Sequence, residues 1–204
     1  MVPVNCSHCG RAHEAESFPS INVALDPQLK ARVKDGSLFV SECPFCGTRN
    51  LVRFQTLYHD PDRKLMVWLL PEGIEPPEAV SEAVKGLSGY TLRRVYDAGS
   101  LVEKVNLKDA GLDDAVMEMC KWVTRLELAE KNPAVMDAPM KFHRMEGADN
   151  EIVLAFPLNG QMQEVTVGFN VYEDARGILS RNPSVRPGEG FAVVDAAWVE
   201  RYFR

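Results

Sequence analysis

Hydrophobic and polar positions in the first forty residues predict a strand, a helix and a second strand. Apolar residues alternate in FPSINVALD, which favours a strand. The alternating positions are Ile21, Val23 and Leu25. Asp26-Pro27 then has the pattern of a helix N-cap followed by proline at the first helical position. A helix from there would place Leu29 and Val33 on one face and end at Gly36, and SLFVSE would form the next strand.

A β-hairpin is predicted further along, over residues 51–72. Two strand-like runs flank HDPDRK, and Asp60-Pro61-Asp62 has good turn chemistry. A proline-rich break follows at 71–79, and AVSEAVKGL then predicts a helix. YTLRRVYD predicts a short strand, and a helix is expected over 98–105.

The strongest helical pattern lies at 111–132. Apolar residues recur there at helical spacing, and Asp113 and Asp114 occupy the first turn, where the helix dipole favours acidic side chains. The predicted apolar stripe consists of Val116, Met119, Cys120, Val123 and Leu126. Because Cys120 lies on this stripe, we interpret it as a small buried hydrophobic residue and not as a metal ligand.

Residues 132–139, with two prolines, indicate a linker. Beyond it, three runs within 140–170 predict strands, 171–182 predicts a helix, and 189–203 predicts a strand followed by a short helix from Asp195. The fold class is therefore expected to be α+β. We predict a first domain at 1–131 and a small α+β domain or extension at 140–204.

Composition and charge narrow the class of protein. The chain has 204 residues, of which 46% are hydrophobic and 25% charged, which is ordinary for a globular protein. The net charge of -6 gives no long-range attraction to nucleic acid. The N-terminus lacks the basic and apolar regions of a signal peptide, and no stretch is apolar enough to span a membrane. We therefore expect a soluble cytoplasmic protein, in which thiols stay reduced.

Four of the five cysteines form two matched C-x-x-C-G units, Cys6/Cys9 with Gly10 and Cys43/Cys46 with Gly47. A zinc knuckle uses such a turn, and glycine adopts the positive φ after its second cysteine without steric cost. Four thiolates complete the tetrahedral shell of one structural zinc ion. The pattern favours zinc, with iron in the same thiolate site as an alternative.

The segment CPFC also resembles the dithiol of a thiol–disulfide redox protein, which would act through Cys43 and Cys46. Such a dithiol opens a helix, whose N-terminus lowers the thiol pKa. Here GTRN and then LVRFQTLY follow, which predict a turn and a strand. The 33 residues between Cys9 and Cys43 are more than a compact zinc ribbon has between its two cysteine pairs. The predicted strand and helix therefore form an insertion in the ribbon.

Other candidate groups favour structural roles. His59-Asp60 could be an acid–base pair, but the surrounding turn chemistry favours a hairpin end. Asp62 and Lys64 match part of a metal-dependent nuclease motif, yet a turn does not supply the rigid strand that such a site requires. His8 and His13 lie beside the first cysteine pair, where four thiolates leave no vacant ligand position.

Several stretches resemble bacterial CpXC-domain proteins. They are SINVALDPQLKARVKDGSLFVSECPFCG, LYHD, KLMVWLLPE and LRRVYDAGSLVEKVNLKDAGLDDAVMEM, with DAAWVERYF similar to the tails of these proteins. The resemblance covers residues 4–128 well and the rest loosely. It implies a metal-binding module without an assigned biochemical function, with Cys6, Cys9, Cys43 and Cys46 as ligands. Ser7 stands where the second motif has Pro44, which changes backbone stiffness but not the ligands.

Three functions remain open from the sequence. A non-catalytic zinc-stabilised module that binds another protein is favoured by elimination. A nucleic-acid-binding zinc ribbon is disfavoured by the acidic balance, with Arg49 and Arg53 beside Phe54 as its only support. An enzyme remains possible, but no recognisable catalytic constellation points to one.

Overall fold

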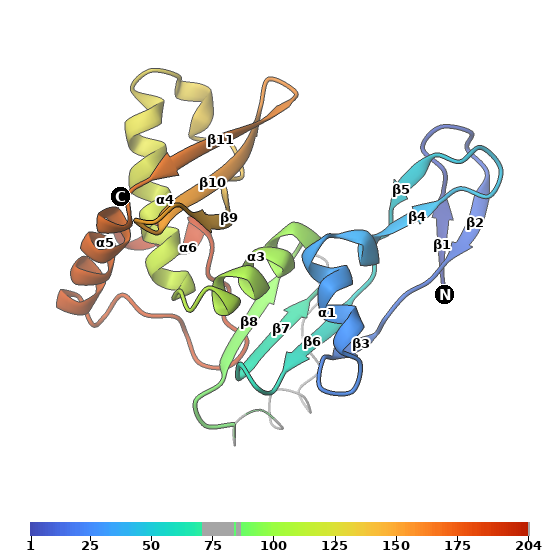
Figure 1. Cartoon of the computed structure of the whole chain (residues 1–204), viewed down its shortest axis with the longest axis horizontal. Helices are drawn as coiled ribbons and strands as arrows, with labels where there is room; N and C mark the ends of the chain where they lie inside the picture. Colours follow the sequence, from blue (N-terminus) through green and yellow to red (C-terminus); the bar gives the residue numbers. More distant parts are fainter. Residues whose placement is uncertain (71–83, 85–86, 204) are drawn as a thin grey trace. The chain divides into compact units, whose positions relative to one another are not determined.

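The computed structural model describes residues 1–70, 84 and 87–203, and the chain divides into two compact units, Met1–Val102 and Glu103–Arg204. It contains helices and several small sheets, so the predicted α+β class is confirmed (Figure 1). The predicted proline-rich break at 71–79 and most of the predicted helix at 79–87 lie outside the described residues.

The first unit combines two hairpins with a mixed sheet. The hairpins are β1–β2 and β4–β5, and the sheet has the order β3-β6-β7-β8, in which only the β6–β7 pair is antiparallel. The strands are β1 Val2–Asn5, β2 Ala12–Ala15, β3 Ser20–Asn22, β4 Val40–Glu42, β5 Arg49–Leu51, β6 Thr56–Asp60, β7 Leu65–Leu69 and β8 Thr91–Val95. The predicted hairpin around HDPDRK is therefore confirmed as β6–β7.

The predicted insertion between the cysteine pairs is present as β3 and α1, Pro27–Lys34. Asp26 caps α1 by accepting a hydrogen bond from Gln28 N, and Leu29 and Val33 are buried, as predicted. The predicted end of the first strand and the predicted start of the second strand are wrong. Residues 23–25 form a turn after β3, and Ser37–Phe39 forms a 3-10 helix, η1, so that the strand into the second cysteine pair begins only at Val40.

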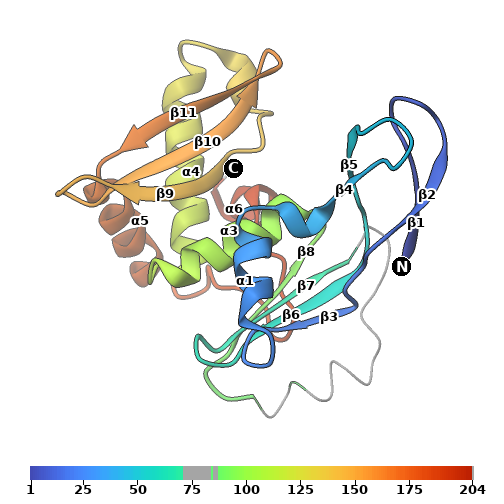
Figure 2. The same ribbon diagram turned by 45° about the vertical axis from the view of Figure 1, so that its right-hand side comes forward.

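The second unit packs helices against an antiparallel sheet of order β11-β10-β9 (Figure 2). Its elements are β9 Lys141–Glu146, β10 Glu151–Leu158, β11 Gln161–Val167, α4 Asp114–Ala129, α5 Phe169–Arg181, α6 Ala196–Phe203 and the 3-10 helix η2 Pro133–Val135; α3, Ala98–Asp109, begins in the first unit. The three strands and α4 to α6 match the predicted pattern. The strand predicted before Asp195 is wrong, because only an isolated bridge occurs there.

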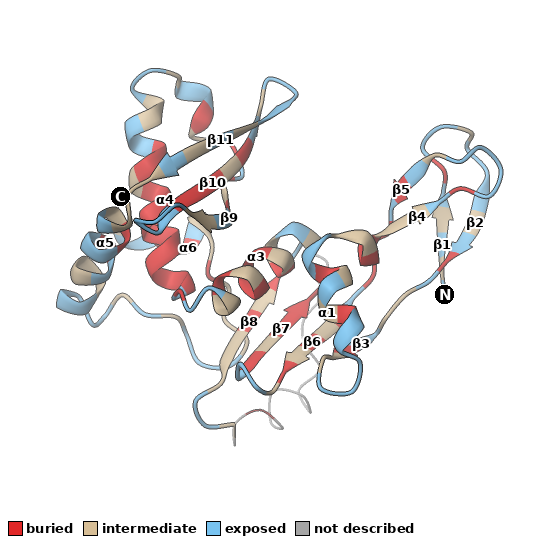
Figure 3. Cartoon of the chain, viewed as in Figure 1, coloured by how far each residue is buried: buried red, intermediate tan, exposed pale blue. Residues whose placement is uncertain are grey.

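The core of the second unit joins α4 to the sheet and to the segment predicted as a linker. Met119 and Cys120 of α4, Leu154 of β10 and Val135 of η2 all lie in one buried apolar cluster. Figure 3 shows buried residues along both α4 and β10. The predicted break at 132–139 therefore lies inside this unit, and independent folding of 140–204 stays a prediction. The predicted stripe is wrong at Leu126, whose side chain is 46% exposed.

Buried charges run through this apolar core. Lys121 Nζ lies 2.8 Å from Glu103 Oε1 and 2.7 Å from Glu118 Oε1, with all three side chains buried. Glu103 Oε1 also accepts a hydrogen bond of 2.6 Å from Phe142 N. Each carboxylate thus has a partner, which offsets the cost of removing it from water. The sequence did not reveal this network, because charged residues are by default expected at the surface.

Candidate metal centre

The four predicted ligands lie in two hairpin turns with the same local structure. In the first, Gly10 N donates to Cys6 O at 3.0 Å; in the second, Gly47 N donates to Cys43 O at 2.9 Å. Gly10 and Gly47 have φ of 71° and 72°, a left-handed conformation that costs a residue with a Cβ more than it costs glycine. A Cβ would meet no close contact at either position, so the requirement is conformational.

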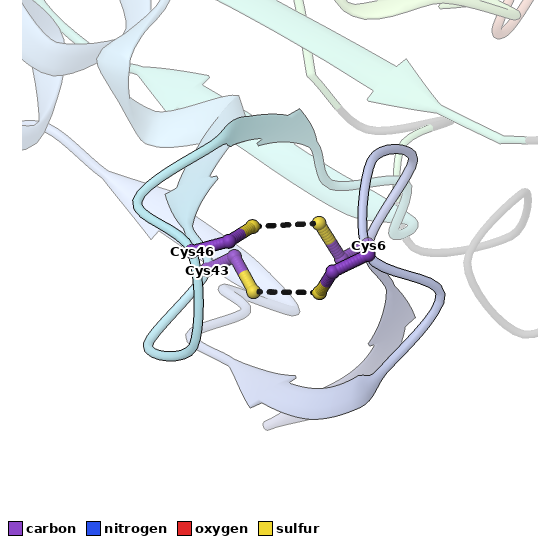
Figure 4. A group of neighbouring side chains, drawn as sticks. Cys6, Cys43 and Cys46 are labelled. Carbon is purple, nitrogen blue, oxygen red and sulfur yellow. Dashed lines mark hydrogen bonds between the residues drawn. The ribbon is translucent and has the colours of Figure 1, made fainter.

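The two turns face each other and bring the four sulfur atoms together (Figure 4). Cys6 Sγ lies 3.6 Å from Cys46 Sγ, Cys9 Sγ lies 3.7 Å from Cys43 Sγ, and all four atoms lie within 4.8 Å of one another. A tetrahedron of sulfurs about 2.3 Å from a zinc ion has edges of about 3.8 Å. A disulfide would need a separation of about 2.05 Å. The spacing therefore fits a metal ion at the centre, and the cysteines are free thiols.

Without a bound metal ion, the thiols of the cluster differ in acidity. A hydrogen bond from Cys9 N and further local bonds lower the pKa of Cys6 to about 6, and the Thr48 hydroxyl lowers the pKa of Cys46. Although Arg11 N lowers the pKa of Cys9, burial and the neighbouring thiols raise it to about 11. Four thiolates so close together need a cation, so metal binding must displace protons that remain on the site.

Asn50 joins the two hairpins next to the thiols. Its Oδ1 accepts hydrogen bonds from Ser7 N at 2.8 Å and Ser7 Oγ at 3.0 Å, and its Nδ2 donates to Thr48 O at 2.9 Å. The side chain is buried, which is unusual for asparagine in a strand. Asn50 therefore holds the first cysteine turn against the second. The sequence did not reveal this role, because Asn50 belongs to a stretch predicted as a turn and its partner Ser7 is 43 positions away.

The two histidines near the cysteines lie outside the cluster. His8 is exposed, and His13 is half-buried with Nε2 3.3 Å from Ser41 Oγ of the opposite hairpin. The fifth cysteine, Cys120, is fully buried in the core of the second unit, and burial raises its pKa to about 11. Its position agrees with the prediction of a small core residue.

The predicted turn at the β6–β7 hairpin accounts for its acidic residues. Asp60 Oδ1 accepts from Arg63 N at 3.1 Å, and its Oδ2 lies 2.8 Å from Lys30 Nζ of α1. His59 Nε2 lies 3.2 Å from Tyr90 Oη. Lys64 occupies the turn itself, with φ of 48°. The buried Asp60 thus fixes the turn and α1, as the turn interpretation expects.

The fold and the cysteine cluster define a class: an α+β protein with a metal-binding module built from two cysteine turns. The chain matches the model of the CpXC protein family over residues 4–121, more than half of its length, and it belongs to that family. No curated protein and no solved structure matches it significantly. None of the described helices has the length and apolar character that crossing a membrane requires.

Proposed function

We propose that the chain is a non-catalytic module, stabilised by one structural zinc ion, that binds another protein in the cytoplasm. The sulfur spacing at the four-cysteine cluster carries the metal part of the proposal. Thiolates are soft ligands that prefer zinc to magnesium or calcium, and four of them leave no open position for a substrate or water. Zinc in such a site supplies folding free energy, and iron is the competing metal.

The surface of the cysteine hairpins supports a protein partner. Phe45, in the second cysteine turn, and Leu51, at the end of β5, are 51% and 60% exposed, so each offers a separate apolar contact to a partner. The two hairpins carry exposed charges of both signs, with Arg11 and Arg49 balanced by Glu14 and Glu42. A balanced surface on a chain of net charge -6 suits a polypeptide better than a phosphate backbone.

One observation favours nucleic acid as the alternative. The Arg11 guanidinium lies 5.1 Å from the ring centre of the exposed Phe45, at the tip of the cysteine hairpins. An exposed aromatic ring beside arginine can stack on an unpaired base. Binding of that kind would weaken steeply with salt.

Recovery of the tagged protein from its native host after cross-linking separates the two partners. Samples treated with nuclease and left untreated are compared at low and high salt. We expect stoichiometric protein partners that resist nuclease. Recovery of nucleic acid without protein, lost in high salt and reduced by Phe45→Ala, would show that the alternative is right and the proposal wrong.

A further inference from the structure

A pocket of about 360 Å³ lies in the first unit between η1, the chain after β5, β7 and the start of α3. Phe39, Val52, Phe54 and Leu69 form its buried apolar part. The rings of Phe39 and Phe54 are stacked with centres 5.5 Å apart, which gives a firm aromatic wall. The volume is near the small end of ligand sites, about 300–1,000 Å³, so it suits one bulky side chain and its neighbours.

Apolar surface continues beyond the mouth of this pocket. Leu51 and Tyr96 line it and remain substantially exposed. A ligand confined to the pocket would leave these side chains in water, whereas an extended polypeptide could cover them as well. The rim therefore favours a polypeptide over a small molecule.

The charges at the rim favour a carboxylate on that polypeptide. Arg53 lines the pocket, is exposed and has no ion-pair partner among the described residues. Tyr96 Oη accepts a hydrogen bond from Arg94 Nη2 at 3.1 Å, so its own hydrogen can be donated to a ligand. Asp97, the only acid among the described residues that line the pocket, already accepts from Ser100 N at 2.8 Å and Ser100 Oγ at 2.6 Å at the start of α3.

The metal site and the pocket share one hairpin. In the register of β4–β5, Glu42 lies opposite Arg49 where the two strands meet the second cysteine turn. Val40 lies opposite Leu51 at the other end of the hairpin, next to the pocket. Val52 N then donates to Phe39 O at 2.8 Å, which joins two residues that line the pocket. A metal ion that fixes the turn therefore also fixes the register of the pocket wall.

We propose that this pocket receives a bulky apolar side chain of a partner polypeptide, whose flanking carboxylate pairs with Arg53. The inference rests on the proposed function, since it names the chemistry of the protein partner. In this proposal the zinc ion also supports binding, because it holds the hairpin that forms one wall of the pocket.

The test uses the zinc-loaded full chain and three peptides: acetyl-Asp-Asp-Phe-Asp-Asp-amide, the same peptide with Lys in place of Asp, and the Asp peptide with Ala in place of Phe. Binding is followed by amide chemical shifts in ¹⁵N-labelled protein. We expect the first peptide to shift Val52, Phe54 and Ala98, and the other two to shift them less. Removing zinc with a chelator should abolish this binding.

Arg53→Glu should weaken the Asp peptide about threefold to fivefold and favour the Lys peptide, since exposed ion pairs contribute modestly. Arg49→Glu is the matched control, because Arg49 is exposed on the same strand region but does not line the pocket. Leu51→Asp should weaken every Phe peptide, with Met162→Asp on the exposed face of β11 as its control.

If no amide chemical shift changes at millimolar peptide, or if Arg53→Glu and Arg49→Glu change peptide affinity equally, the proposal that this pocket binds the peptide is wrong. If phenylpropionate binds as tightly as the Asp peptide, the proposal of a polypeptide occupant is wrong and the pocket binds a small molecule. A host partner that binds Arg53→Glu and Leu51→Asp as tightly as the wild type would overturn the pocket and leave the proposed function standing. Absence of any protein partner would instead remove the proposed function itself.

Discussion

The cysteine hairpins and the core of the second unit are held together by different interactions. The hairpins bury few apolar side chains, and their two turns meet through four sulfur atoms and the hydrogen bonds of Asn50. The second unit buries a large apolar cluster on both sides of α4 and places paired charges inside it. Loss of metal should therefore affect the hairpins first, whereas loss of packing should affect the second unit.

The largest expected effect comes from truncation after residue 131. The fragment keeps all four clustered cysteines but loses Leu154 and Trp198, which belong to the same core as the buried face of α4. We expect it to bind one metal ion and yet to aggregate and bind a hydrophobic dye, because α4 is uncovered. Metal content, light scattering and dye fluorescence give the answer. A soluble, cooperatively folding fragment would show that 1–131 is a domain, as the sequence predicts.

Cys43→Ser should have the next largest effect. Removing one thiolate opens the shell, and binding of structural zinc is worth roughly 10–16 kcal/mol in small zinc peptides. We expect loss of metal and a lower melting temperature. Cys120→Ser, in the other unit, should keep full metal content and cost about 1–3 kcal/mol for its buried hydroxyl. Full metal content in Cys43→Ser would contradict the four-thiolate site.

Lys121→Met tests the second unit in the same way. It leaves the carboxylates of Glu103 and Glu118 buried without their shared ammonium, which we expect to cost about 3–5 kcal/mol. The matched control is Arg144→Met, which breaks exposed pairs with Glu146 and Glu164 and should cost about 0–1 kcal/mol for each pair. Urea unfolding measures both, and metal content should not change in either. Equal costs would mean that the buried network contributes nothing special.

Asn50→Ala should weaken the metal site without touching a ligand. Loss of its bonds to Ser7 and Thr48 should lower zinc affinity about tenfold, in the range known for residues that orient metal ligands. Ser41→Ala removes the longer contact to His13 between the same hairpins and should change affinity less than about twofold. Competition with a chelator of known affinity measures both variants.

The smallest effect concerns protons released when zinc binds. At pH 8, Cys6, with a pKa of about 6, is already ionised, whereas Cys9, with a pKa of about 11, still carries its proton. We expect more than zero but fewer than four protons per zinc, measured by calorimetry in buffers of different ionisation enthalpy. As the pH falls toward 6, the pKa of Cys6, this thiol becomes protonated in the absence of zinc, so the number of protons released per zinc ion should rise. Release of four protons at pH 8 would contradict these pKa values.

Local patterns in the sequence predicted the local structure well. Asp26-Pro27 and the two Cys-Gly turns act through neighbours within a few residues, so their structures could be inferred directly. The cysteine spacing likewise indicated a cluster that the fold does bring together. What failed depends on distant partners. Leu126 fits a helical stripe, but the direction of burial was set by the sheet that packs on α4.

Asn50 and Lys121 escaped sequence reasoning for the same reason. The amide of Asn50 binds Ser7, 43 positions away, and Lys121 meets Glu103 across two helices. Neither pairing has a local signature, and polar residues are by default expected at the surface. The pocket likewise brings together residues 39 to 98, which only the folded unit places side by side.

The most direct test of the central claim is metal analysis of protein purified without added metal, together with thiol titration before and after denaturation in chelator. We predict about one zinc ion per chain and no reaction of Cys6, Cys9, Cys43 and Cys46 until the protein is denatured with the metal removed. Absence of metal together with a readily oxidised pair at Cys43 and Cys46 would contradict it and point to a thiol–disulfide redox protein.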